Sequence, residues 1–188
     1  ILKYFRRLIT LRTKKENFTY SIKNYFNFIR FNNKKNVYLF KKKVVDKTNE
    51  NKDISLNDIL DKVKSNKNLL KLDIEGGEYS IVDKINQNSS KIKILIIEFH
   101  FIKTKKNTFI RSVKKLLNNF DIIHLHANNY FNLTSKDTFF EVLEVSFVNK
   151  KINKYKKNLT YNFPLKHLDF ECFPDRKKIN FSFKIKHK

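Results

Sequence analysis

Apolar positions along the chain follow two spacings, which predicts helices interleaved with short strands. Between Asn17 and Arg30 they recur every three or four residues, the period of an amphipathic helix packed on a core. The same period begins again after Ser55, and Asp58 stands at the spacing of a helix-starting capping box. Continuous apolar runs at residues 69–72 and 94–97 predict two buried strands.

The remaining apolar patterns complete an α/β order. We expect a short helix within residues 1–16, a strand over 37–45, helices over 78–85 and 109–117, strands at 120–126 and 138–148, and an edge strand at 179–186. A helix between the two apolar runs makes a β-α-β unit, which pairs its strands in parallel. No helical pattern separates residues 126 and 138, so the last two core strands should form an antiparallel hairpin. The predicted fold is therefore α/β, a Rossmann-like sheet that is mostly parallel and has an antiparallel hairpin near its C-terminal end.

The length and charge of the chain limit its number of domains and its kinds of partner. With 188 residues the chain fits one domain, with a basic segment at 1–16, an α/β core at 17–148 and a tail at 149–188. The net charge of +23 suggests a polyanionic partner. However, the basic residues are spread along the chain, which is rich in Lys, Asn, Ile and Phe as AT-rich coding sequence would make it. We therefore favour compositional drift over a dedicated nucleic-acid surface.

Cysteine content and hydropathy indicate the cellular compartment and whether a membrane span is expected. Cys172 is the single cysteine, so neither a disulfide within the chain nor a cysteine-based zinc site can form. This fits a reducing compartment, and we expect a cytoplasmic protein. No apolar run approaches the roughly 20 residues of a membrane-spanning helix, so no membrane span is expected.

Candidate chemistry gathers where the two buried strands end. Asp73 and Glu75 follow the first strand, and Glu98 and His100 follow the second. The carboxyl ends of parallel strands form the ligand-binding edge of an open α/β sheet. If the strands are neighbours, Glu98 lies near Asp73, and one acid of such a pair can serve as a base. Gly76 allows the tight turn into the following helix.

Each of these residues also has a structural interpretation. Glu75 and Glu78 could simply stabilise the positive end of the helix that follows them, and for Glu78 we favour that role. A divalent metal could also be bound by Asp73, Glu75 and Glu98 together with His100 and His126, but their spacing matches no recognised local motif. We therefore predict no metal ligands.

Several segments resemble a known family. The sequences SLNDIL, LLKLDIEGGEYSIV and ILIIEFH are similar to the FkbM-type methyltransferases, whose pattern combines a D-x-E-G-x-E element with an apolar strand ending in Glu. Downstream, IIHLHANNY, EVLEVSF and FPLKHLDFECFP resemble the later segments of one branch of that family. The resemblance covers about residues 55–176.

The resemblance implies a class I methyltransferase fold and S-adenosylmethionine as cofactor. Sugar or small-metabolite hydroxyls are the typical acceptors, so the expected partner is a small molecule or glycan. The predicted site comprises catalytic Asp73, Glu75 and Glu98, cofactor-binding Asp73 and Gly76, and acceptor-binding His100, His126, Asn128 and Asn129.

One family feature is missing. The family fold begins with a strand and a glycine-rich turn that wraps the cofactor, yet this chain has no glycine before Gly76. We expect either a truncated piece, which we favour, or a degenerate member, and in both cases poor cofactor binding by this chain alone. The alternative function is a non-catalytic basic module, in which the lysines and aromatic residues of 1–45 and 149–161 bind nucleic acid or another polyanion.

Overall fold

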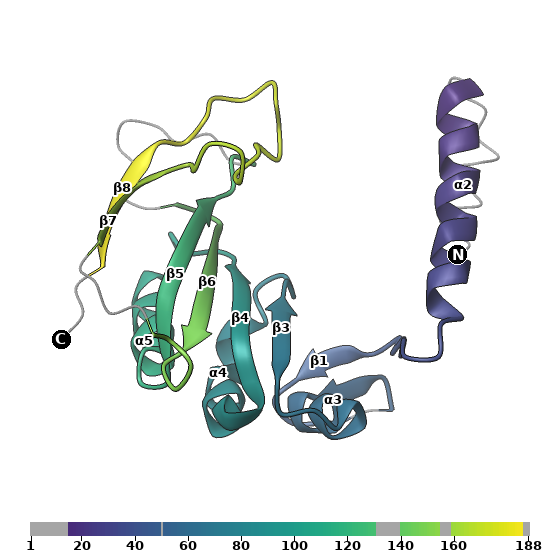
Figure 1. The fold of residues 1–188 in the computed structure, drawn as a ribbon, viewed down its shortest axis with the longest axis horizontal. Coiled ribbons are helices and arrows are strands. Elements are labelled where there is room, and N and C mark those ends of the chain that lie inside the picture. The colour runs from purple at the N-terminus through teal and green to yellow at the C-terminus, as the bar shows by residue number, and fades with distance from the viewer. Residues whose placement is uncertain (1–14, 50, 131–139, 155–158, 186–188) are drawn as a thin grey trace. The chain divides into compact units, whose positions relative to one another are not determined.

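The structure is a computed structural model that describes residues 15–49, 51–130, 140–154 and 159–185 (Figure 1). It contains two compact units, residues 1–41 and residues 42–188. Both α-helices and β-sheets are present, which confirms the α/β fold class in its general form. Most of the predicted helix within residues 1–16 lies outside the described residues.

The first unit contains one described helix, α2 (Lys15–Asn32), where the apolar period predicted it. Tyr25, Phe26 and Ile29 of this helix are exposed, so the expected packing on a core is not present among the unit's described residues. The strand predicted over residues 37–45 is wrong for 37–40, which have no regular structure. An apolar run becomes a strand only where another strand is available for pairing, and only its second part has one.

In the second unit, two short strands pair in parallel ahead of the main sheet. They are β1 (Lys43–Val45) and β2 (Asp53–Ser55), and β2 was not predicted. Helix α3 (Leu56–Val63) then begins with the predicted capping box. Ser55 Oγ accepts from the Asp58 N–H at 3.2 Å, and the Ser55 N–H donates to Asp58 Oδ2 at 3.1 Å.

The main sheet has four strands in the order β3-β4-β6-β5. Its strands are β3 (Asn68–Leu72), β4 (Ile92–Phe99), β5 (Phe120–Ala127) and β6 (Leu143–Asn149). The pairing of β3 with β4 is parallel, which confirms the β-α-β unit, and the pairing of β5 with β6 confirms the antiparallel hairpin. Because β6 also pairs antiparallel with β4, it separates β4 from β5. Three of the four strands therefore run in the same direction.

Two helices cover one face of this sheet. Helix α4 (Glu78–Gln87) fills the predicted β-α-β crossover, a short 3-10 turn η1 (Ser89–Lys91) follows it, and α5 (Lys106–Leu116) packs against α4. Alternate residues of β4 and β6 point into this layer, and Phe99 meets Phe109 of α5 edge to face at 5.2 Å. The core side chains on these two strands are Ile92, Leu95, Ile97, Phe99, Leu143, Val145 and Phe147.

A third, two-stranded sheet lies in the C-terminal segment. It pairs β7 (Leu159–Phe163) antiparallel with β8 (Phe181–Ile185). The predicted edge strand corresponds to β8, whereas no strand was predicted at β7. Phe163 stacks on Phe181, with 5.1 Å between the ring centroids.

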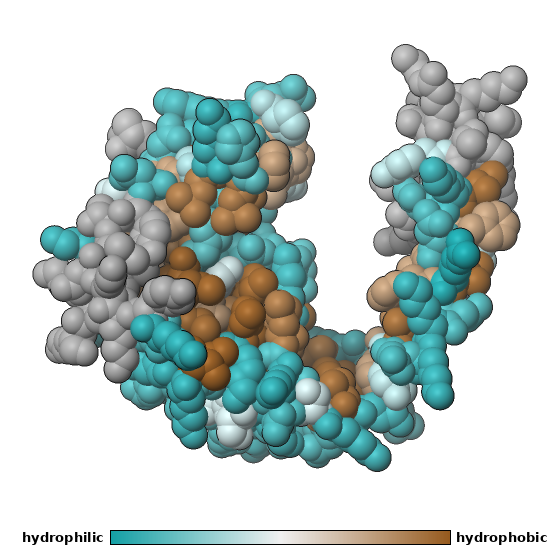
Figure 2. All heavy atoms as spheres, in the orientation of Figure 1, coloured by the Kyte–Doolittle hydropathy of each residue, from teal (hydrophilic) through white to brown (hydrophobic). Residues whose placement is uncertain are grey.

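Hydrophilic and large hydrophobic side chains both reach the surface of the described residues. Figure 2 shows hydrophilic residues over most of the visible face, with hydrophobic ones in smaller patches between them. None of the described helices is both long and apolar enough to cross a lipid bilayer.

Candidate active site

Strand register aligns four polar residues across the main sheet. Asp73 and Glu98 each come one residue after a registered Cα pair of β3 and β4, so they lie side by side. Glu98 is paired with Glu144 of β6, and Glu144 is paired with His126 of β5. Paired residues project from the same face of a sheet, here the face opposite α4 and α5. We call Asp73, Glu98, Glu144 and His126 the polar row.

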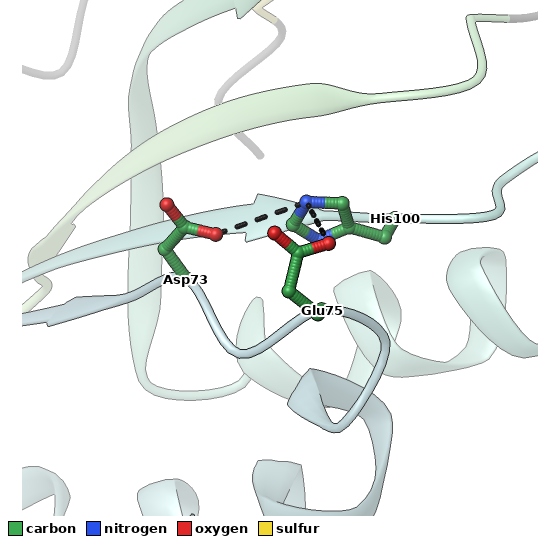
Figure 3. A group of neighbouring side chains, drawn as sticks. All are labelled: Asp73, Glu75 and His100. Carbon is green, nitrogen blue, oxygen red and sulfur yellow. Dashed lines mark ion pairs between the residues drawn. The ribbon is translucent and has the colours of Figure 1, made fainter. Parts of the chain in front are cut away.

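His100 lies beside the Asp73 end of the polar row. It directly follows β4, and Figure 3 shows its ring facing the carboxylates of Asp73 and Glu75. His100 Nε2 is 3.8 Å from Asp73 Oδ1 and 3.6 Å from Glu75 Oε2. These distances are too long for hydrogen bonds. The imidazole is buried, whereas the two carboxylates are open to solvent.

The turn between β3 and α4 directs Glu75 toward this histidine. Glu75 has φ 53°, a left-handed conformation that is uncommon for residues other than glycine. Gly76 follows with φ +95°, and a Cβ atom there would lie 2.8 Å from the Phe101 ring. Gly76 is therefore required by the turn and by this packing, and its predicted contact with a cofactor stays a prediction.

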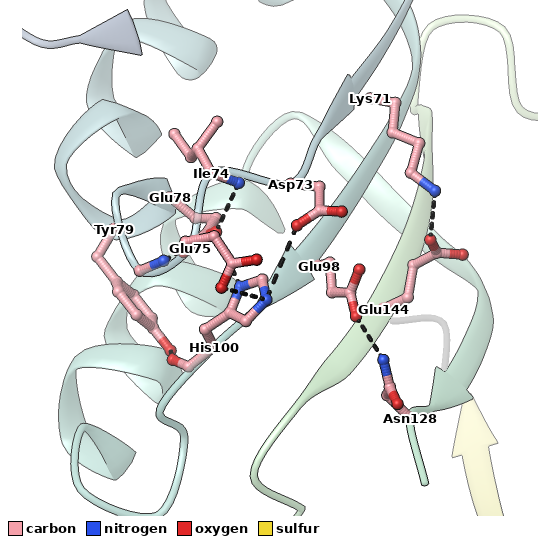
Figure 4. A network of polar contacts seen from close by, with 11 residues as sticks. Lys71, Asp73, Ile74, Glu75, Glu78, Tyr79, Glu98, His100, Asn128 and Glu144 are labelled. Carbon is pink, nitrogen blue, oxygen red and sulfur yellow. Dashed lines mark hydrogen bonds and ion pairs between the residues drawn. The ribbon is translucent and has the colours of Figure 1, made fainter. Parts of the chain in front are cut away.

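A buried carboxylate fixes the turn and the histidine together. Glu78, the first residue of α4, is fully buried, and its Oε1 accepts from the N–H groups of Ile74 at 3.1 Å and Gly76 at 3.2 Å (Figure 4). The same oxygen lies 3.0 Å from His100 Nδ1. Because Glu78 Oε1 already accepts from two N–H groups, Nδ1 is assigned as a further donor to it, and Nε2 faces Asp73 and Glu75.

Tyr79 holds the backbone of the same histidine. Its hydroxyl donates to the His100 carbonyl at 2.6 Å. Burial, followed by the charges of Glu78 and Glu141, raises the pKa of Tyr79 far above its usual value, so the hydroxyl keeps its proton. His100 is thus fixed at both its ring and its main chain, which is the kind of support that a precisely oriented functional group needs.

The centre of the polar row opposes two like charges. Glu98 and Glu144 face each other across β4 and β6, an arrangement that destabilises a sheet. Lys71 Nζ offsets it by contacting Glu144 Oε2 at 2.9 Å, and Asn128 Nδ2 donates to Glu98 Oε1 at 2.9 Å (Figure 4). The pKa of Lys71 is raised chiefly by its hydrogen bond with Glu144 and by the charge of that carboxylate, with smaller contributions from Glu98 and Asp73.

The histidine end of the polar row is held by the C-terminal segment. His124 Nε2 lies 2.8 Å and His126 Nδ1 3.1 Å from Asp169 Oδ1. Burial acts to raise the pKa of Asp169, but the Leu165 N–H, which donates to its other oxygen, and the two histidines outweigh burial, and the pKa is lowered. Asp169 therefore stays ionised and ties this segment to β5.

The structure brings most of the predicted site residues together. Asp73, Glu75, Glu98 and His100 share one edge of the sheet, and Asn128 joins them through Glu98. Asn129 lies apart: it is buried, donates to the Phe173 carbonyl at 2.9 Å and accepts from its N–H at 3.0 Å, which are structural contacts. His126 and Asn129 both line a small pocket under the C-terminal segment. Acceptor binding by any of these residues stays a prediction.

Sequence reasoning missed three residues of this arrangement. Glu78 was interpreted as an acid that stabilises the start of the helix, because nothing local shows that it meets a histidine 22 residues later. Glu144 and Asp169 were not predicted as site residues either. Alternation along β6 places Glu144 opposite the core, but its contact with Lys71 depends on the strand order.

A mixed α/β sheet with acids gathered at its strand ends defines an enzyme-like α/β domain. Comparison with protein families identifies which one: the chain matches the methyltransferase FkbM domain over residues 8–130. The match spans most of the chain, and the protein belongs to this family, as the sequence segments predicted. It begins earlier and ends earlier than the predicted resemblance over 55–176. No curated protein and no solved structure matches the chain.

Proposed function

We propose that the protein is an S-adenosylmethionine-dependent methyltransferase that methylates a hydroxyl of a sugar or small metabolite. Family membership indicates a methyltransferase. The observation that carries the finer proposal is the side-by-side placement of Asp73 and Glu98, with His100 next to them, at the carboxyl ends of two parallel strands. This is the edge at which open α/β sheets bind ligands.

The residues present fit one end of the cofactor. The Asp73 and Glu75 side chains are 46% and 80% exposed, and as carboxylates they suit the positively charged sulfonium and ammonium groups of S-adenosylmethionine. The sequence has no glycine-rich turn before Gly76 to wrap the cofactor. Of the possible cofactor contacts, we therefore assign only the one made by Asp73 to this chain. When bound, S-adenosylmethionine supplies an electrophilic methyl group.

Glu98 is best placed to take up the proton of the acceptor. Methylation of a hydroxyl releases a proton, which a positioned carboxylate can accept. Asn128 fixes Glu98 Oε1, leaving Oε2 as the atom that receives the proton. Asp73 and His100 lie together on one side of Glu98, where they can contact neighbouring hydroxyls of the acceptor, which suits a polyhydroxylated acceptor. The basic-module alternative gives no role to this cluster of acids.

Substitution of Glu98 by Gln tests this assignment. The full chain is assayed for transfer of labelled methyl from S-adenosylmethionine to a panel of sugars and small alcohols, and cofactor binding is measured separately by calorimetry. We expect Glu98→Gln to lower kcat by about 100-fold or more, with cofactor affinity unchanged, because only proton removal is lost. The matched control is Asp83→Asn, an exposed acid of α4 that pairs with Lys115.

Two results would contradict the proposal. The first is a wild-type chain that shows no cofactor binding at all, not even the weak binding expected of a chain without a glycine-rich turn before Gly76. The second is a Glu98→Gln variant that turns over at the wild-type rate.

A further inference from the structure

We propose that Asp73, Glu75 and His100 form a binding site for one divalent metal ion. One ligand atom from each residue lies within 4.8 Å of the others, and His100 Nε2 faces Asp73 Oδ1 and Glu75 Oε2. The site shares Asp73 and His100 with the proposed function, but metal binding is measured with neither cofactor nor acceptor present, so the two proposals can fail separately.

The spacing of the three atoms fits a shared ion. With metal–ligand bonds of about 2.1 Å, two ligand atoms lie roughly 3 Å apart at right angles and roughly 4.2 Å apart on opposite sides of the ion. The nitrogen–oxygen distances of 3.6 and 3.8 Å fall within that interval. Glu75 is largely exposed, so its carboxylate is free to close the remaining gap.

His100 carries the hallmark of a metal ligand. Histidines that bind metals donate their other ring N–H to a carboxylate, which fixes the ring and makes the ligating nitrogen more basic. Glu78 Oε1 is that carboxylate, 3.0 Å from Nδ1 and fully buried. His100 is itself only 8% exposed, and its Nε2 points into the cluster without making a hydrogen bond to the described residues. The burial of His100 and its contact with Glu78 are observations separate from the presence of Asp73 and Glu75.

The charges of the Asp73 and Glu75 carboxylates also favour binding of a cation. The chain has 41 Lys and Arg residues, yet among the described residues neither Asp73 nor Glu75 forms an ion pair with any of them. Their one ionisable partner within 4 Å in the described part of the chain is His100, whose Nε2 faces both carboxylates. Either a proton on Nε2 or a divalent cation between the three groups offsets the repulsion between the carboxylates, and titration with a metal ion distinguishes the two.

The donor set limits which metal fits. One imidazole and two carboxylates suit Mn²⁺ and similar ions better than Mg²⁺ or Ca²⁺, which prefer oxygen alone. Three protein ligands leave coordination positions open, as in metal sites that bind a reacting group. The solvent exposure of Asp73 and Glu75 gives an ion access to the cluster.

Titration of the full chain with Mn²⁺ alone tests the site. Bound Mn²⁺ loses the six-line electron paramagnetic resonance signal of the free ion, so one equivalent should disappear on binding. We expect Glu75→Gln and Asp73→Asn each to weaken binding at least tenfold, and Glu78→Gln to weaken it about 10- to 100-fold by releasing His100. Glu75 is so exposed that its variant should keep its fold, which circular dichroism checks.

Asp83→Asn is the control and should bind Mn²⁺ like the wild type, because Asp83 pairs with Lys115 on the helix surface. The site is disproved if the wild type binds no stoichiometric Mn²⁺, or if Glu75→Gln and Asp73→Asn bind it as well as Asp83→Asn does. A chain that binds Mn²⁺ but no cofactor would support the metal site and contradict the proposed function. A chain that binds the cofactor but no Mn²⁺ would support the proposed function and contradict the metal site.

Discussion

The two faces of the main sheet differ sharply, although neighbouring residues of the same strands build them. On one face Ile97 and Phe99 of β4 are fully buried under α4 and α5. On the other, Glu98 lies between Asp73 and Glu144, and two of these acids oppose each other directly. Like charges that face each other across a sheet cost stability, and for this reason we predict that this face serves a ligand rather than packing.

The largest effect should come from the helix-covered face. Phe99→Ala removes a fully buried ring that packs on Tyr79 and Phe109, and we expect the free energy of unfolding to fall by about 3–5 kcal/mol. Urea denaturation followed by circular dichroism measures this. A loss as small as that of a surface substitution would mean that this face is not the core.

Asp169 should show an intermediate effect with a defined pH dependence. Asp169→Ala removes the acceptor for two histidines and the Leu165 N–H, which should cost roughly 1–3 kcal/mol. Because the pKa of Asp169 is lowered on folding, its contribution to stability is fully present above the unfolded pKa of about 3.9 and is lost as the pH falls through the folded pKa.

Denaturation at a series of pH values from 7 downward measures that contribution. The Asp169→Ala variant should show a smaller loss of stability in acid than the wild type. Parallel curves for the two proteins would contradict the assignment.

The smallest effect is expected in the polar row. Glu144→Gln relieves repulsion with Glu98 but weakens the exposed contact with Lys71, so stability should change by less than about 0.5 kcal/mol. Lys71→Gln, which leaves both carboxylates unrelieved, is the comparison and should be the less stable of the two. A change of several kcal/mol in Glu144→Gln would show that the row is structural.

Sequence patterns predicted the features that depend on neighbouring residues. The apolar runs gave β3, β4 and the helix between them, and with them the adjacency of Asp73 and Glu98. Strand β7 was missed because it follows a Lys- and Asn-rich stretch and pairs with β8 about 20 residues later. For the same reason the buried role of Glu78 was missed, since it depends on His100, which a different strand supplies.

The left-handed backbone at Glu75 has a consequence for how this position tolerates change. A side chain in that conformation costs about 1 kcal/mol relative to glycine, so Glu75→Gly would relax the turn. The same substitution would delete the carboxylate that faces His100. A relaxed backbone and a carboxylate facing His100 are therefore opposing demands on this one position.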